Sequence, residues 1–232
     1  DLFSTTNELL SSTYYYLGAR EKGDEVADYT HDYKTGRDSY YFYGVTAGTD
    51  GVRASAADLD DTMVRSAVSR DAAFDEANLR SETFYDITQG KGQERAVLSY
   101  NYSLNGTTVR TSTLYVYEEG DYEVARMTES KTYDGEVAFT DLFATTNELL
   151  SSTYYYLGAR EKGDEVADYT HDYKTDRDSY YFYGVTAGSD GVRASAADLD
   201  DTMVRSAVSR DAIFNEANLR SETFYDITQG KG

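Results

Sequence analysis

Aspartates form the groups of side chains in this sequence that are best suited to chemistry. Two clusters have the same spacing. The first is Asp58, Asp60 and Asp61, and the second is Asp198, Asp200 and Asp201. Carboxylates and backbone carbonyls are the ligands that Ca²⁺ takes, and the turn Glu118–Asp121 offers the same donors. None of these groups has the spacing of an EF-hand loop. A calcium site and a solvated acidic face are both open interpretations.

Other chemistry has little support. The two histidines, His31 and His171, lie 140 residues apart in equivalent places, and a surface position on a strand is expected for each. Cysteine is absent, which excludes thiolate sites and disulfides. No Ser-His-Asp, HExxH, Walker or GxGxxG pattern occurs. The sequence therefore predicts no catalytic residues, no enzyme activity and no cofactor apart from calcium.

A long tandem repeat organises the chain. Residues 1–92 return as 141–232 with five differences among 92 pairs, which are Ser4/Ala144, Gly36/Asp176, Thr49/Ser189, Ala73/Ile213 and Asp75/Asn215. Repeat unit one thus spans 1–140, and 141–232 is a partial second copy. Near-identical tandem copies are typical of arrays in which each unit meets its neighbours through the same surface.

Composition narrows the class of protein. The net charge is −20, which disfavours nucleic-acid binding because phosphates would be repelled. Proline is absent, so backbone hydrogen-bond ladders can run without interruption. No apolar run reaches the ~18 residues of a membrane helix. These features favour a solvated, repetitive protein with no membrane span in this segment.

Alternating residues predict hairpins. Tyrosine-rich strands are expected at 12–16, 38–43, 81–85 and 112–117, each followed by a glycine turn and a short Val/Ala segment. Residues 96–104 alternate with a period of two, Asn105–Gly106 predicts a type I′ turn, and 122–128 predicts a further strand. The fold class is therefore mainly β, with about four hairpins per unit, in a solenoid-like array or a spiralling sheet.

Two kinds of segment depart from this pattern. Residues 56–79 hold Leu59, Met63, Val64 and Val68, which predicts either a helical stripe or a short strand. Residues 1–10 predict a short helix. With their copies, short helical insertions are expected near 1–10, 56–79, 141–150 and 196–219, either covering a sheet face or facing a partner.

Tyrosine runs put aromatic rings on both faces of a strand. The residues expected to serve packing or assembly are Tyr14, Tyr15, Tyr16, Tyr40, Tyr41, Tyr43, Tyr115, Tyr117, Tyr154, Tyr155, Tyr156, Tyr180, Tyr181 and Tyr183. They favour contacts between strands, repeats or chains. An aromatic platform for sugars is the alternative.

Two motifs, His31-Asp-Tyr-Lys-Thr-Gly-Arg37 and Phe84-Tyr-Asp-Ile-Thr-Gln-Gly-Lys91, resemble the tyrosine–aspartate (YD) repeats of the Rhs family, and Tyr133-Asp-Gly135 matches part of them. The second copy has Asp176 where the first has Gly36. The resemblance implies a long ribbon of β-hairpins that spirals into a secreted or surface-attached shell.

Together these patterns predict a structural repeat segment of a very large extracellular or cell-surface protein. Its expected partners are neighbouring repeats and other copies of the chain, in a fibre, sheath or shell. The alternative is an adhesin-type module that binds glycans through Tyr and Asp side chains, with or without calcium.

Overall fold

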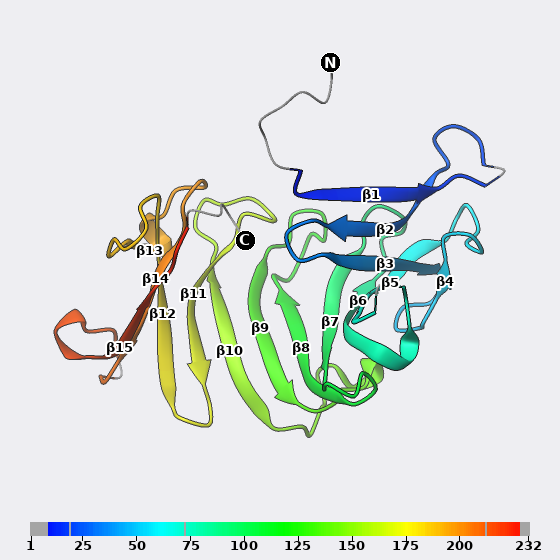
Figure 1. The fold of residues 1–232 in the computed structure, drawn as a ribbon. Helices are drawn as coiled ribbons and strands as arrows, with labels where there is room; N and C mark the ends of the chain where they lie inside the picture. The colour runs from blue at the N-terminus through cyan, green and yellow to red at the C-terminus, as the bar shows by residue number, and fades with distance from the viewer. Residues whose placement is uncertain (1–8, 19, 72, 212, 228–232) are drawn as a thin grey trace, which may run out of the picture. The chain divides into compact units, whose positions relative to one another are not determined.

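The computed structural model describes residues 9–18, 20–71, 73–211 and 213–227 (Figure 1). As predicted, the protein is mainly β. The chain forms two compact units, Asp1–Ser112 with Gly135–Thr146, and Thr113–Asp134 with Asn147–Gly232. These units are offset from the sequence repeats, because 113–134 of the first repeat belongs to the unit that contains most of the second.

Among its described residues, the first unit contains six longer strands and one short one. They are β1 (Ser11–Tyr16), β2 (Val26–Asp32), β3 (Arg37–Gly44), β4 (Val52–Arg53), β5 (Thr62–Ser69), β6 (Leu79–Asp86) and β7 (Arg95–Tyr102). Their order is β1-β2-β3-β5-β6-β7, with β4 beside β3. The neighbouring strands in this order run antiparallel, as do β3 and β4. Strand β8 (Val109–Tyr117) has residues in both units.

The second unit repeats most of this arrangement, with one strand of the first repeat added before the copied strands and, among the described residues, none after them. Its strands are β9 (Met127–Asp134), β10 (Leu149–Tyr156), β11 (Val166–Asp172), β12 (Arg177–Gly184), β13 (Val192–Arg193), β14 (Thr202–Ser209) and β15 (Leu219–Phe224). The order is β9-β10-β11-β12-β14-β15, with β13 beside β12. The register is also repeated: Tyr14 pairs with Tyr29 and Tyr154 with Tyr169, each followed by an irregularity.

Both faces of β3 are covered. Tyr40 and Phe42 pack with Ala67 and Leu79 in one buried cluster. Tyr43, the next residue along, packs in a second cluster with Val26, Ala54 and Ala57. Because side chains alternate along a strand, the two clusters lie on opposite faces. This agrees with the two-sided aromatic pattern of the sequence.

The helical interpretation of 56–79 and 196–219 is wrong for most of each segment. Strands β5 and β14 occupy their centres, and the helical parts are three-residue 3₁₀ turns, η1 (Glu76–Asn78), η3 (Ala194–Ala196) and η4 (Glu216–Asn218). Thr62, Val64 and Val68 are stiff, β-branched residues that fit a pleated sheet. The strand alternative for Val64 and Val68 is the correct one.

The other expected helices also differ from the structure. Near 141–150 only the 3₁₀ turn η2 (Phe139–Asp141) forms, and β10 already begins at Leu149. Residues 149–150 extend because Leu149 pairs with Tyr133 on β9 and the Leu150 carbonyl accepts the Tyr173 N–H. Of the helix predicted at 1–10, residues 1–8 lie outside the described residues, and Leu9 and Leu10 have no helical structure.

Turns differ in detail from the expectation. Gly106 has a positive φ of 76° but Asn105 does not, so the predicted type I′ turn is wrong. Instead, Asn105 Oδ1 accepts hydrogen bonds from the Thr107 and Thr108 N–H groups, which widens the loop. The strand predicted at 122–128 begins only at Met127, because Asp121 O accepts the Ala125 N–H in a preceding turn.

The β2–β3 turn shows the effect of one substitution between the copies. Gly36 has φ +66°, and Asp176 at the same place has φ +52°. Among the described residues, Asp176 is the one non-glycine residue with a positive φ. A side chain in this left-handed region is strained, although aspartate tolerates it better than most residues do.

We therefore expect Asp176→Gly to stabilise the protein by about 0.5–1 kcal/mol, because it removes this strain. The matched change Gly36→Asp introduces the same strain in the first copy and should destabilise by a similar amount. Urea unfolding of the two full-length variants measures both effects. Equal signs for the two changes would contradict this account.

Candidate functional site

The predicted aspartate clusters lie in equivalent turns before β5 and β14. The Asp58 N–H donates to Asp61 Oδ2 at 2.8 Å, and the Asp198 N–H donates to Asp201 Oδ2 at 2.9 Å. One carboxylate of each cluster thus closes its own turn. Within the described ranges, no three His, Cys, Asp or Glu side chains gather in a group that could hold a metal ion. Calcium binding by these turns stays a prediction.

Two of the predicted tyrosines in each unit form a ladder with a third tyrosine, Tyr29 or Tyr169, that was not predicted. Tyr14 stacks on Tyr29 with ring centroids 4.6 Å apart, and Tyr29 lies 5.6 Å from Tyr40. The Arg53 guanidinium lies 4.7 Å from the centre of the Tyr40 ring. The second unit repeats this set, with Tyr154 on Tyr169 at 4.8 Å and Tyr169 at 5.7 Å from Tyr180. The ladder joins three neighbouring strands.

The remaining tyrosines lie elsewhere. On the opposite face, the Tyr41 hydroxyl donates to Thr30 Oγ1 at 2.8 Å, and the Tyr43 hydroxyl donates to the Ala27 carbonyl. Tyr181 and Tyr183 make the equivalent contacts, and Tyr16 packs beside Tyr43. Tyr15 is exposed on β1, whereas Tyr155 and Tyr156 are half-buried on β10, and Tyr115 and Tyr117 are half-buried on β8. A role in assembly stays a prediction for all of them.

The histidines are partners of neighbouring strands. His31 Nδ1 lies 2.6 Å from Asp38 Oδ1, and these residues face each other in the β2–β3 register. The Tyr40 hydroxyl donates to the other oxygen of Asp38 at 3.2 Å. His171 and Asp178 repeat the contact at 2.8 Å. Each histidine therefore belongs to a cross-strand polar pair on a partly buried face.

The first unit contains a buried ion pair that was not among the residues expected from the sequence. Arg65 on β5 is 2% exposed, and its Nη1 donates to Glu82 Oε2 at 2.9 Å. The guanidinium lies 4.1 Å from the centre of the Phe42 ring. Burial raises the pKa of the Glu82 carboxyl, while hydrogen bonds from Tyr102 and Arg65 oppose this rise. The pair thus joins β5 to β6 inside the sheet.

The equivalent group of the second unit is more open. Arg205 is also 2% exposed, but Glu222 is 42% exposed, against 5% for Glu82. Strand β15 has no described neighbour at its outer edge, whereas β6 pairs with β7. The same residues therefore differ in burial because their neighbouring strand differs.

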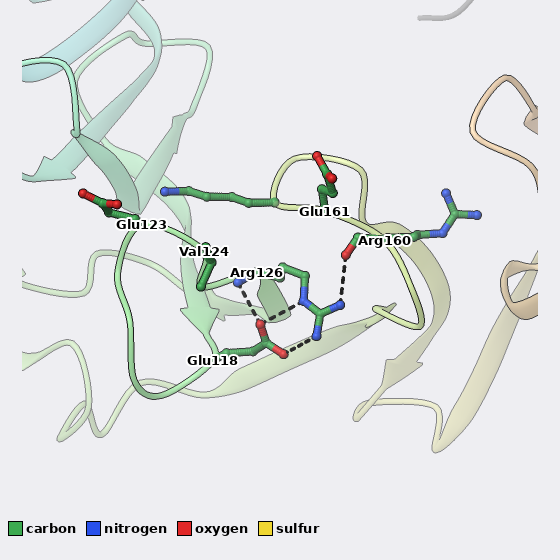
Figure 2. A pocket seen from close by; sticks show the side chains of 7 residues that line it. Glu118, Glu123, Val124, Arg126, Arg160 and Glu161 are labelled. Atoms are coloured by element: carbon green, nitrogen blue, oxygen red, sulfur yellow. Dashed lines mark hydrogen bonds and ion pairs between the residues drawn. The ribbon is translucent and has the colours of Figure 1, made fainter.

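A junction centred on Arg126 joins the β8–β9 turn to the loop after β10 (Figure 2). Arg126 Nε donates to Glu118 Oε2 at 2.9 Å and Nη2 donates to Glu118 Oε1 at 2.6 Å. Nη1 faces the carbonyl oxygens of Leu157, Gly158 and Arg160 at 3.3, 3.1 and 3.0 Å. One guanidinium thus bridges a carboxylate and the backbone of a second loop.

The electrostatics of the junction follow from this geometry. The side-chain hydrogen bonds from Arg126, together with its backbone N–H, lower the pKa of Glu118 to about 2. Glu118, which the sequence placed in a calcium turn, therefore has both oxygens occupied by Arg126. The next contact along is a hydrogen bond from the Met127 N–H to Glu165 Oε1 at 3.0 Å.

Sequence reasoning missed Arg65, Glu82 and Arg126. A charged residue inside the apolar run of β5 was the available signal for Arg65, because a buried arginine needs an acidic partner. Arg126 had no comparable signal, since its carbonyl partners lie more than thirty residues away.

Within the described residues no helix is long and apolar enough to cross a bilayer.

The two copies allow a matched test of the buried pair. Arg65→Met leaves Glu82 buried without its partner and should destabilise by about 3–5 kcal/mol at pH 8, where free carboxyls are ionised. Arg205→Met leaves Glu222 in contact with water and should cost about 2 kcal/mol less. Urea unfolding of both full-length variants provides the values. An equal loss of unfolding free energy in the two variants would show that burial of Glu82 by β7 does not determine the cost of removing the arginine.

Comparison with known proteins gives no further guide to the role of these contacts. No protein-family model matches the chain, and no curated protein or solved structure is significantly similar to it.

Proposed function

We propose that this chain is a structural repeat segment of a very large extracellular or cell-surface protein. In this proposal, repeats add strand by strand to form an elongated or self-associating fibre, sheath or shell. The observation that supports it most is the offset of compact units from sequence repeats. Strand β9, from the first repeat, pairs with β10, from the second.

This offset has a simple physical meaning. A β-strand needs hydrogen-bond partners along its edges, and β10 obtains one set from the preceding repeat. Arg126 adds side-chain contacts to the same junction. When each repeat completes the next one, stability grows by nearest-neighbour terms and the array extends by one unit at a time. An acidic surface then limits non-specific aggregation.

In the same proposal the protein has no catalytic role. Titratable groups that the fold brings together form ion pairs or hydrogen bonds with each other, as in the pairs Arg65–Glu82, Arg126–Glu118 and His31–Asp38. The resemblance to YD repeats supports the architecture only. Its first motif, residues 31–37, forms the β2–β3 turn, in which Asp32 Oδ1 accepts the Thr35 N–H at 2.6 Å.

One observation favours the second candidate, an adhesin-type module that binds glycans. The outermost ring of the ladder, Tyr14, is 45% exposed and stacks on Tyr29. Flat exposed aromatic rings suit the apolar faces of sugars. Calcium would assist such binding if the aspartate turns held it.

Small-angle X-ray scattering of the 232-residue chain at several concentrations, with calcium or with a chelator, tests the structural proposal. We expect an elongated particle whose length grows with concentration, because free strand edges can pair between copies. A matched pair of variants, Tyr15→Ser and Tyr155→Ser, provides the control. Only the first change lies on an exposed edge and should reduce the growth.

A compact monomer that is insensitive to concentration would contradict the structural proposal. Saturable binding in a glycan screen would then favour the adhesin. A change in scattering only on addition of calcium would assign a real site to the aspartate turns.

A further inference from the structure

Three turns of the chain share the pattern Lys-Gly-x-Glu, and they are 22–25, 91–94 and 162–165. Two of them hold a preceding strand in the same way. The Met63 N–H donates to Glu94 Oε1 at 3.2 Å, and the Met127 N–H donates to Glu165 Oε1 at 3.0 Å. We call a turn that makes this contact a Lys-Gly-x-Glu clamp.

The lysine of each engaged clamp adds a second contact to the preceding segment. Lys91 Nζ donates to the Leu59 carbonyl at 2.9 Å, and Lys162 Nζ donates to the Tyr122 carbonyl at 3.2 Å. In both cases the clamp follows the strand that pairs directly with the strand being held. The clamp thus grips the start of β5 or β9 across one intervening strand.

The first clamp, residues 22–25, is preorganised but not engaged. Glu25 Oε2 accepts the Gly23 N–H at 2.9 Å, as Glu165 Oε2 accepts the Gly163 N–H at 2.9 Å. In the part of the chain that the structure describes, Glu25 Oε1 and Lys22 Nζ make no contact like those of the other two clamps. Glu25 is exposed, whereas Glu165 is half-buried.

The strand beside this clamp is also uncovered. Tyr15 and Leu17 are 57% and 61% exposed. Their copies, Tyr155 and Leu157, are half-buried, because β9 lies beside β10 and Arg126 reaches the Leu157 carbonyl. Ser130 Oγ lies 3.3 Å from the Tyr155 hydroxyl in the same contact. The equivalent residues of strands β1 and β10 have the same sequence, so the difference in exposure comes from the segment that lies beside β10.

We propose that the outer edge of β1 and the clamp at 22–25 form a docking site for another copy of the segment Glu118–Asp134. This inference rests on the proposed structural function and names its partner. The docked segment pairs along β1 as β9 pairs along β10. Its Met127 N–H meets Glu25, and its Arg126 meets the carbonyl oxygens of Leu17 and Gly18.

A synthetic peptide of sequence 118–134, labelled with a fluorophore, tests this site in a titration with the full-length chain. Salt at about 0.15 M screens the repulsion between two acidic partners. We expect saturable binding of one peptide per chain, because the equivalent site on β10 is already occupied by β9. A peptide of the same composition in scrambled order should not bind.

Two variants locate the bound peptide. Glu25→Gln in the chain should weaken binding about tenfold, because it removes a charge-assisted hydrogen bond. Asp24→Asn removes the same charge in the same turn and should leave the affinity unchanged, because its copy Asp164 does not line the pocket around Arg126. A peptide with Arg126→Gln should also bind more weakly, and it tests the contact without altering the fold of the chain.

Failure of the peptide to bind saturably would overturn this inference. So would equal affinity of the Glu25→Gln and Asp24→Asn chains together with equal affinity of the wild-type and Arg126→Gln peptides. If scattering shows assembly and the peptide does not bind, the docking site is wrong while the structural function stands. If the peptide binds and the chain does not assemble, the docking site is supported and the proposed assembly fails.

Discussion

The demand of strand edges for hydrogen-bond partners is the constraint on which the rest of the structure depends. Burying a backbone N–H or carbonyl of an edge strand away from water costs free energy when the group has no hydrogen-bond partner. Strand β10 meets this demand with β9, and Arg126 and Glu165 secure that pairing with side-chain contacts. Tyrosine ladders and buried arginines then add packing to strands whose order is already fixed.

The near-identity of the two copies makes this constraint visible within one chain. Gly48 has no room for a Cβ because Phe139 lies against it, whereas at Gly188 the same space is open. Phe84 is 7% exposed beside β7, and its copy Phe224 is 44% exposed. One sequence thus gives two levels of burial, and the neighbouring segment accounts for the difference.

Local patterns predicted the strands better than the contacts between them. The period-two alternation predicted at 96–104 corresponds to β7, which ends at Tyr102, and the tyrosine runs fall on β1, β3, β6 and β8. At 56–79 the spacing of apolar residues fitted a helix and a strand equally, and pairing with β3 and β6 decided for the strand. The contacts of Glu82 and Arg126 depend on long-range register, which local spacing does not contain.

Amide hydrogen exchange of β6 and β15 tests most directly whether the neighbouring strand sets local stability. Peptides 73–86 and 213–226 differ in mass because Ala73 and Asp75 are replaced by Ile213 and Asn215, so each copy is followed separately. The account predicts exchange at least about tenfold slower across Leu79–Phe84, which β7 covers, than across Leu219–Phe224. Equal protection of the two strands would contradict it.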